Sequence, residues 1–531
     1  MTLKPLVPLL FLSLLLSSCA DDNFFQKDAL ATKEEVAGAA PAGPDSVWVI
    51  AGRHYDRSAF FRLFWGNHNR AIWTTPVQVP VFDLNKTKGG LKVLSLGGGF
   101  QTTSFELQDS TGRRYAFRSI DKDPVEVLPK FWHHTFVAGI VRDQTSASNP
   151  YGALVVPVLA QAVGVPHSNP AIYYVSYNDT TFGEYASRVQ GRLFLLEDKF
   201  KVPADLNQQF GDAHAFLNSD DALRLRFSSN HYHFDQKAFA RARLLDLLIG
   251  DWDRHKGQWD WAVSNQGQDT LFKPIPKDRD QVFLKMDDGI VPSIATSKLM
   301  ARKLHSFDNR FKDVKAYMIN AEFIDERLLN ELSRDDWQRI ARQMQAALTD
   351  QVIERAVRQF PRAVYNLIGK DVTQALKNRR DELPEAAKKM YKILAQEVTI
   401  AGSDLVEQFL VKRLLEGQVE VTITRPASGA APEKTLYHRV FNPKETERII
   451  LHGLADDDVF TIEGETKESI KIDVYGGLGE DEITDRSSVQ GFGKMTRIYD
   501  TERGNELDFG TEARDHTTRD VRVHAFDREG N

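Results

Sequence analysis

Two acidic segments separated by a hairpin constrain this chain more than any other feature. The first segment, residues 250–259 (GDWDRHKGQW), directly follows an apolar helical run at 239–249. We expect Asp235 to cap the start of that helix and Gly250 to end it. A buried helix therefore delivers several charged side chains at its C-terminal end.

A β-hairpin is predicted at residues 259–275, and it leads into the second acidic segment at 277–283 (KDRDQVF). Phosphoryl transfer needs a carboxylate that orients the attacking hydroxyl and oxygen ligands that hold a divalent cation on the phosphates. Asp253 is the candidate for the first task. Gln258, five residues later, and Asp278 are the candidates for the second.

A different use of the same residues stays open. Asp251, Asp253 and His255 alternate, so an extended segment would place them on one face as a metallohydrolase cluster. That arrangement gives Asp278 and Asp280 no role. In the kinase-type arrangement Asp280 assists metal binding, and His255 orients its loop. Buried ion-pair networks use the same residue types and are a third interpretation.

Two resemblances support the kinase-type arrangement, and a third covers most of the mature chain. The triplet DRH at 253–255, followed by Gln258, resembles the catalytic loop of atypical kinases, including the secretory-pathway Fam kinases and the lipid kinases. The sequence DRDQVF at 278–283 resembles the metal loop of the CotH spore-coat kinases. From about Ser46 the chain is similar to a group of Bacteroidetes envelope proteins, some fused to a calcineurin-like phosphoesterase or an outer-membrane barrel. The resemblance implies a two-lobed kinase-like domain that uses ATP with Mg²⁺ or Mn²⁺.

A glycine-rich turn lies upstream of these segments. Strands are predicted at 91–96, 102–107 and 115–120, and the first two are joined through Gly97, Gly98 and Gly99. Backbone N–H groups of such a turn can lie against phosphates. Ordinary hairpin chemistry explains the glycines equally well.

The third predicted strand carries a cation. By resemblance to the CotH pattern, Arg118 stands where a phosphate-binding lysine is expected, with Lys122 just beyond it. A guanidinium is a planar fork and an ammonium a point charge, so this position departs from the family's pattern. In the same comparison Glu197 falls near the connection between the lobes. The alternative for Glu197 is a surface ion pair with Lys199 or Lys201.

The N-terminus predicts export. The apolar run at residues 6–16 is too short to span a bilayer and is typical of a secretory signal. It ends in LSSC, which resembles a bacterial lipobox in which Cys19 is lipidated and becomes the first mature residue. Asp21 and Asp22 resemble acidic surface-export signals. We expect an outer-membrane lipoprotein, periplasmic or surface-facing, with residues 20–45 as a tether.

The remaining chain predicts two further parts. The expected fold class is α+β: a kinase-like core at 46–291, a helical lobe or extension at 292–417, and a small all-β domain at 418–531. With 531 residues, a net charge of −6 and no basic tract, the chain has no feature of a nucleic-acid-binding protein. Cys19 is the only cysteine, which excludes an intrachain disulfide.

The C-terminal domain contains an acidic glycine-rich turn. Residues 476–484 (GGLGEDEIT) match the repeat of calcium-binding β-rolls, and an approximate copy lies at 453–460. Asp481 and Asp485 are the calcium candidates. Acidic turns in a small β-domain are the alternative interpretation.

One segment resembles a metallophosphoesterase motif but lacks the rest of such a site. Residues 66–69 (GNHN) resemble the Gly-Asn-His motif of calcineurin-like phosphoesterases. A two-metal site needs several ligand motifs, and no Asp-x-His motif precedes this one. We interpret the segment as a packed element.

Two functions are consistent with these features. The first is a lipid-anchored phosphotransferase that moves phosphate from a nucleotide to a hydroxyl of a protein or small molecule. The second is a non-catalytic, kinase-like module that binds a ligand or an envelope partner. Gln258 and Arg118, where most kinases carry Asn and Lys, and the scarcity of ATP in the bacterial envelope favour the second.

Overall fold

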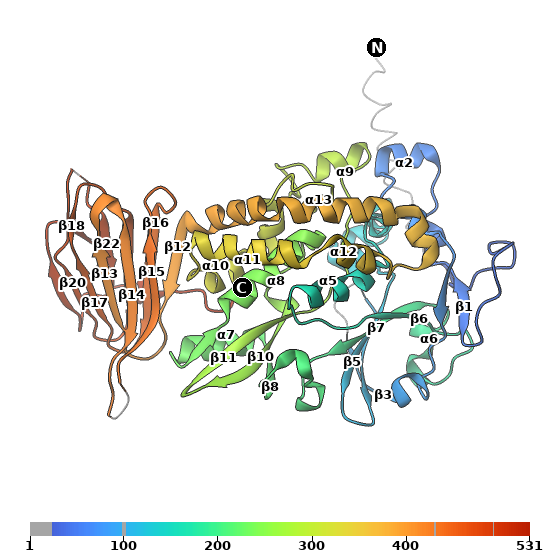
Figure 1. Ribbon diagram of the computed structural model, residues 1–531, viewed down its shortest axis with the longest axis horizontal. Helices are drawn as coiled ribbons and strands as arrows, with labels where there is room; N and C mark the ends of the chain where they lie inside the picture. The colour runs from blue at the N-terminus through green and yellow to red at the C-terminus, as the bar shows by residue number, and fades with distance from the viewer. Residues whose placement is uncertain (1–23, 98–101, 430–431, 492, 531) are drawn as a thin grey trace, which may run out of the picture.

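The computed structural model describes residues 24–97, 102–429, 432–491 and 493–530 (Figure 1). The protein is α+β and elongated. A small lobe built on a β-sheet lies at one end, helices form the middle, and a β-rich domain forms the other end. The predicted lipidation residue Cys19 and the glycines Gly98 and Gly99 lie outside the described residues.

The small lobe is organised by a five-stranded antiparallel sheet. Its strand order is β3-β4-β5-β7-β6, formed by Leu91–Gly97, Ser104–Asp109, Arg114–Ser119, Leu193–Lys199 and Ala171–Tyr174. The first three strands form the expected meander. Phe117 stacks on Phe194 with ring centroids 4.5 Å apart, so aromatic side chains fill one face of the sheet.

Short elements surround this sheet. They are β1 (Ser46–Val49), α2 (Ala59–Trp65), α3 (Arg70–Trp73), β2 (Val77–Pro80), α4 (Phe136–Gln144), α5 (Val156–Ala162) and α6 (Ala186–Val189). Strands β1 and β2 pair antiparallel beside the lobe.

Helix α8 (Gln236–Ile249) forms the centre of the molecule. The Asp235 side chain accepts a hydrogen bond from the Ala238 amide, and Gly250 ends the helix with a φ of +72°, which confirms both predicted caps. The helix is preceded by β8 (Ala215–Asn218), α7 (Ser219–Ser228) and β9 (Tyr232–Phe234).

The predicted hairpin follows the first acidic segment. Strands β10 (Trp259–Gln266) and β11 (Asp269–Pro276) pair antiparallel within a sheet of order β8-β10-β11-β9. Trp259 and Trp261 are fully buried and fix the hairpin against α8, where Phe239 packs on Trp259. The hairpin therefore starts and ends at the two acidic loops.

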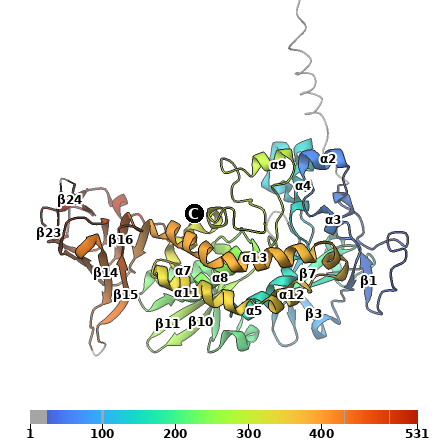
Figure 2. The same cartoon turned by 45° about the horizontal axis from the view of Figure 1, so that its top comes forward.

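Helices α11 (Arg334–Ala347) and α13 (Arg362–Ala395) contact α8 from the other side. Helices α10 (Glu322–Leu328) and α12 (Asp350–Val357) complete the helical middle, and α9 (Ile290–Ala295) lies beside α2 at the edge (Figure 2). Arg379 of α13 donates to the carbonyl oxygens of Leu247 and Leu248, at 2.6 and 2.9 Å, so the long helix also caps the end of α8.

The β-rich part begins at Glu397, well before the boundary expected at residue 418. One sheet is parallel throughout, in the order β12-β16-β19-β22-β24: Glu397–Ala401, Arg448–Ala455, Lys471–Leu478, Thr496–Tyr499 and Ala513–Asp515. Strand β12 follows α13 without a glycine or proline between them, so the sequence carries no marker of this boundary.

The second sheet packs on the first. Its order is β15-β14-β13-β17-β20-β23, formed by Lys434–Phe441, Val419–Arg425, Gln408–Arg413, Val459–Glu463, Glu482–Asp485 and Glu506–Phe509. Short strands β18 (Glu465–Thr466) and β21 (Ser488–Val489) pair at one edge. Phe460, Ile483 and Leu507 are in register on adjacent parallel strands, so successive turns of the chain stack as a coil.

The β-rich domain contacts the tip of the central hairpin. Asp269, at that tip, forms ion pairs with Arg425 of β14 at 3.2 Å and with Lys434 of β15. Arg226 of α7 donates to the Gly402 carbonyl at 3.1 Å. Charged side chains thus join the two parts.

The segment expected to be a tether is packed at Phe24 and Ala29, whereas residues 32–45 are mostly exposed. Phe24 is buried against His54 and Tyr55, and the Ala29 amide donates to the Gly191 carbonyl at 2.7 Å. Residues 20–45 are mostly polar, so their composition does not show that Phe24 and Ala29 pack. The partners of these two residues are distant in sequence. Within the described chain, no helix is long and apolar enough to cross a membrane.

Candidate phosphotransfer site

Arg118 joins the small lobe to the second acidic loop. Its Nη1 lies 2.8 Å from Asp278 Oδ1 and 3.3 Å from Glu197 Oε1. Glu197 of β7 pairs across the sheet with Ala116, two residues from Arg118 on β5. Residues two apart on a strand point to the same face, so the sheet itself brings the glutamate and the arginine together.

Glu197 is not part of a surface ion pair. Its side chain is buried and accepts from Ser168 Oγ at 3.1 Å, and burial raises its pKa. The candidate surface partners Lys199 and Lys201 instead contact Glu106, at 2.5 and 3.4 Å. The expected surface ion pair of Glu197 with a lysine is therefore wrong, and Glu197 contacts Arg118 inside the protein.

The glycine-rich turn begins on the same row of the sheet. Gly97, the last residue of β3, pairs with Ser104, and Ser104 pairs with Arg118. Adjacent strands are about 4.8 Å apart, so Gly97 lies about 10 Å from Arg118 across the sheet. The start of the turn is thus level with the cation that contacts Asp278.

The two acidic loops adjoin each other. Arg254 donates to the carbonyl oxygens of Lys277 and Gln258, at 2.7 and 2.9 Å, and the Lys277 amide donates to the Gln258 carbonyl at 3.1 Å. The Gln258 side-chain amide lies 3.3 Å from Asp278 Oδ2. Gln258 and Asp278, the two principal metal candidates, are therefore neighbours.

Asp280 lies beside a second cation. It forms an ion pair with Lys122 Nζ and accepts from the Gln281 side chain at 2.9 Å. Asp278 has a φ of +60°, a left-handed conformation that costs a non-glycine residue free energy. The loop thus accepts backbone strain while both carboxylates face cations from the small lobe.

The electrostatics favour an ionised Asp278. Burial opposes its ionisation, but Arg118 and Lys122 outweigh burial and lower its pKa to about 2. Burial, together with the charge of Asp278, raises the pKa of Asp280. Although burial disfavours the Arg118 cation, Asp278 and Glu197 raise its pKa above the ordinary value. Two cations and a carboxylate thus stay charged side by side.

The donor set suits magnesium held jointly with phosphate. In the described part of the chain, no group of three or more His, Cys, Asp or Glu side chains could hold a metal on its own. Mg²⁺ is commonly bound through one or two carboxylates plus substrate phosphates and water. Asp278 and Asp280 match that pattern, and Gln258, whose Nε2 donates to Asp278 Oδ2, would turn its amide oxygen toward the metal to join them.

Asp253 and His255 have different surroundings. Asp253 is half-buried, and its Oδ1 accepts from Asn320 Nδ2 at 2.8 Å. His255 is exposed, and its Nδ1 accepts from the Gly257 amide at 3.1 Å, which caps the short helix Lys256–Gln258. The ring contact is local, as expected for a residue that orients the loop. Sequence analysis missed Asn320, which no local motif marks.

Asp251 belongs to a buried charge cluster. It is fully buried, 2.8 Å from Arg279 and 3.6 Å from Arg254. The cluster continues through Asp246 on α8 to Arg243, 2.9 Å away. Asp251 therefore neutralises arginines beneath the loops, and the structure does not bring it into an exposed cluster with His255. The ion-pair interpretation applies to Asp251.

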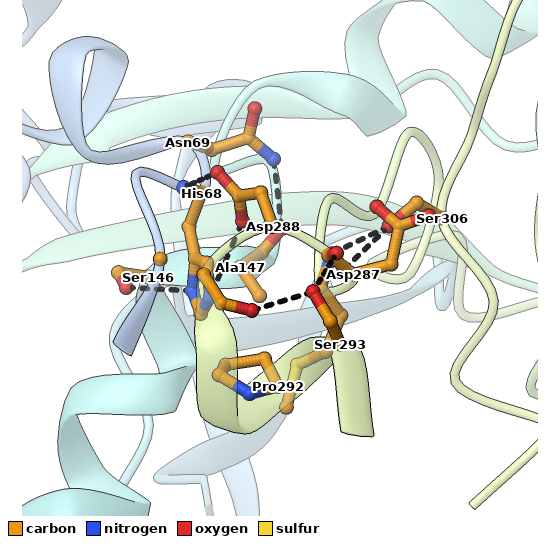
Figure 3. A network of polar contacts seen from close by, with 12 residues as sticks. His68, Asn69, Ser146, Ala147, Asp287, Asp288, Pro292, Ser293 and Ser306 are labelled. Atoms are coloured by element: carbon orange, nitrogen blue, oxygen red, sulfur yellow. Dashed lines mark hydrogen bonds and ion pairs between the residues drawn. The ribbon is translucent and has the colours of Figure 1, made fainter. Parts of the chain in front are cut away.

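The GNHN segment is packed, as expected. His68 lies between Ser146 Oγ, 3.3 Å from Nδ1, and Asp288 Oδ1, 3.5 Å from Nε2 (Figure 3). The order Ser-His-Asp resembles a hydrolase triad, but Ser146 is fully buried and its hydroxyl donates to the Asp143 carbonyl at 2.7 Å. Burial lowers the pKa of His68 to about 4, against the effect of Asp288. The network holds chain segments together.

The calcium candidates lie at opposite ends of one strand. Asp481 precedes β20 and Asp485 ends it, about 13 Å apart at the rise of a strand, so they do not share an ion. Asp481 instead lies beside Asp500. A Cβ placed on Gly476 would clash with Oδ2 of both aspartates, so the two carboxylates lie against the same glycine. The Asp458 amide donates to Asp481 Oδ1 at 2.9 Å, which links successive turns.

The likeness of this chain to known proteins is structural. No known protein family matches the chain, and no curated protein matches it. Among solved structures the chain is similar to the proinflammatory kinase CtkA of Helicobacter pylori, with a TM-score of 0.27 and 11% identity. That match covers 58% of this chain and 98% of the kinase.

Proposed function

We propose that this protein is a metal-dependent phosphotransferase with a kinase-like site, which moves phosphate from a nucleotide to a hydroxyl of a protein or small molecule. The observation that supports it most is the contact of Arg118 with Asp278, beside Gln258 and level with Gly97. A cation from the small lobe, a carboxylate and an amide oxygen are the groups that phosphoryl transfer requires.

Each residue has a task in this proposal. Asp253, oriented by Asn320, accepts the hydrogen bond of the acceptor hydroxyl and aims its oxygen at the phosphate. Gln258, Asp278 and Asp280 hold Mg²⁺ or Mn²⁺, which neutralises phosphate charge when bound. Arg118 and Lys122, the present partners of Asp278 and Asp280, then also contact the nucleotide.

The cations and the turn hold the other side of the nucleotide. Arg118 and Lys122 pair with carboxylates in the structure, and in the proposal they contact phosphate oxygens when a metal takes over those carboxylates. Gly97 would contribute backbone to the phosphate-covering segment, and Glu197 keeps Arg118 in place.

The proposed location is the outer membrane. Lipidation at Cys19 anchors the chain there, on the periplasmic side or at the cell surface. The acceptor hydroxyl then belongs to a molecule of the envelope. Calcium in the β-rich domain remains a separate proposal, in which Asp481 ligates with Asp500 rather than with Asp485.

Nucleotide binding tests the proposal directly. Nucleotide should raise the melting temperature only with Mg²⁺ or Mn²⁺ present, and Asp278→Asn should abolish that shift. Asp520→Asn removes a carboxylate from an exposed ion pair and is the matched control that keeps it. A metal-independent shift, or one that survives Asp278→Asn, would contradict the proposed site.

A non-catalytic module is the second candidate. Both metal-loop carboxylates form ion pairs with cations of the small lobe, which a closed, degenerate site would also show. The two candidates separate by activity. Metal-dependent binding with phosphate transfer supports the enzyme, whereas binding without transfer to any tested hydroxyl supports the module.

A further inference from the structure

An exposed apolar surface lies on helices α2 and α9, which are neighbours at one edge of the molecule, and on the segment that follows α9 (Figures 1 and 2). Phe60 is 74% exposed, Ile294 61% and Leu299 96%. We call this surface the α2–α9 face, and its exposed apolar members are Phe60, Leu63, Ile290, Val291, Ile294, Leu299 and Met300. Contiguous apolar patches of this kind mark protein or membrane contacts.

The α2–α9 face is held in shape. The His68 amide donates to Asp288 Oδ2 at 2.8 Å, directly before α9 (Figure 3). Gly66 and Gly289 meet so closely that a Cβ on either would clash with the backbone of the other segment. Both glycines have positive φ values, 93° and 89°. The two helices therefore present one surface rather than two independent ones.

The start of the described chain lies at the base of this face. The Phe24 ring lies 6.1 Å from the Tyr55 ring and 5.4 Å from the Arg57 guanidinium. Ser58 then caps α2. Phe24 is thus fastened to the residues that lead directly into the exposed helix.

Because Phe24 is packed against the folded protein, only a short segment separates it from Cys19. Four residues lie between Cys19 and Phe24, and the five Cα–Cα steps span at most about 18 Å when fully extended. A lipid on Cys19 therefore keeps the bilayer surface close to Phe24, which packs beside the residues that lead into α2. A free tether reaching to residue 45 would have allowed any face of the protein to approach the membrane.

We infer that the α2–α9 face rests on the lipid bilayer, with its apolar side chains in the interfacial region. The inference depends on the proposed lipidation of Cys19. Apolar side chains of such surfaces enter the boundary between headgroups and acyl chains by about 5–10 Å. Lys298, exposed beside Leu299, would lie at headgroup level, where anionic lipids attract it.

The test uses the mature chain, residues 19–531, coupled through the Cys19 thiol to a maleimide lipid in phosphatidylethanolamine–phosphatidylglycerol vesicles. Cys19 is the only cysteine, so coupling is unique and does not require natural lipidation. Amide hydrogen exchange in residues 59–65 and 290–300 should slow on vesicles relative to the free protein. Exchange in β15, on the far domain, should not change.

Charged variants provide the matched comparison. Leu63→Glu with Ile294→Glu, coupled in the same way, should lose the slowing. Leu415→Glu, at a position that is 81% exposed on the other domain, should keep it. Equal exchange on vesicles and in solution overturns the inference. Slowing that persists in the Leu63→Glu, Ile294→Glu variant overturns it too, because apolar contact then plays no part.

Other occupants of the face have their own outcomes. If a second copy covers it, exchange in these helices slows with protein concentration in solution and sedimentation shows a dimer, which overturns the inference. Lipidation itself is read separately, from the membrane fraction of cells that carry Cys19→Ala. A failure of the anchor can thus be told apart from a failure of the face.

Discussion

Arg118 Nη1 and Asp278 Oδ1 lie 2.8 Å apart, although one belongs to the small-lobe sheet and the other follows the central hairpin. The contact links the small lobe to the loop that follows the central hairpin. Because Glu197 holds the same guanidinium at 3.3 Å, the arginine is positioned before any ligand binds. A ligand that displaces Asp278 or Glu197 from Arg118 must supply a negative charge in place of that carboxylate.

The contact predicts how Arg118 variants bind nucleotide. Arg118→Met should lose the metal-dependent rise in melting temperature, because no cation then faces the phosphates. Arg118→Lys should keep it, since a point charge is what most kinases use. A nucleotide at about 100 times its Kd adds about 2.7 kcal/mol of stability, which differential scanning fluorimetry detects. An unchanged shift in Arg118→Met would place the phosphates elsewhere.

Asp253 should affect chemistry more than binding. Asp253→Asn keeps the hydrogen bond to Asn320 but cannot accept the hydroxyl proton, so transfer should fall by about 100-fold or more. Nucleotide binding should stay close to wild type, as measured by the metal-dependent thermal shift. Equal losses in binding and transfer would mean that Asp253 supports the fold of the loop instead.

The buried charge cluster predicts a large loss of stability. Asp246 lies 2.9 Å from Arg243 and 3.3 Å from Arg254, and it is fully buried. Asp246→Asn leaves the three buried arginines Arg243, Arg254 and Arg279 with only two buried carboxylates, those of Asp251 and Asp325, so the free energy of unfolding should fall by about 3–5 kcal/mol in urea denaturation. Asp508→Asn, in an exposed pair with Arg486, should change it by less than about 0.5 kcal/mol.

The β-rich domain should become less stable as pH rises. Burial raises the pKa of Asp500 to about 7, above the ordinary value of 3.8. A carboxyl with a raised folded pKa contributes its full stability below the unfolded pKa and loses it as pH rises through the folded pKa. In chelator, wild type should therefore weaken between about pH 4 and pH 7.

Asp500→Asn isolates that effect. Its side chain stays neutral, so the variant should be more stable than wild type at about pH 8 and equal to it at about pH 4, by thermal unfolding. Added calcium should raise the melting temperature of wild type at high pH and not that of the variant if Asp481 and Asp500 bind it. Identical pH profiles would show that Asp500 is unperturbed.

The lipid anchor makes a simple prediction. Cys19→Ala should move the protein from the membrane fraction to the soluble fraction, because no helix in the described residues could span a bilayer. Fractionation and immunoblotting measure the change. Retention of Cys19→Ala in washed membranes would contradict lipidation at this residue.

Local features of the site followed from the sequence. The Asp235 and Gly250 caps, the hairpin between the acidic loops and the three-strand meander depend on contacts within a few residues, which residue type and spacing encode directly. The order of Asp253, Gln258 and Asp278 is also a property of the chain. These residues were therefore identifiable before any packing was known.

Tertiary packing decided the rest. Glu197 contacts Arg118 rather than a nearby lysine because the sheet pairs β5 with β7, a choice between distant strands. Asp251 is ion-paired rather than exposed because α8 buries it among arginines. Phe24 is buried instead of forming part of a tether because it packs against His54 and Tyr55. Caps and turns are set by neighbours in sequence, whereas partners far apart in sequence meet only once the core has formed.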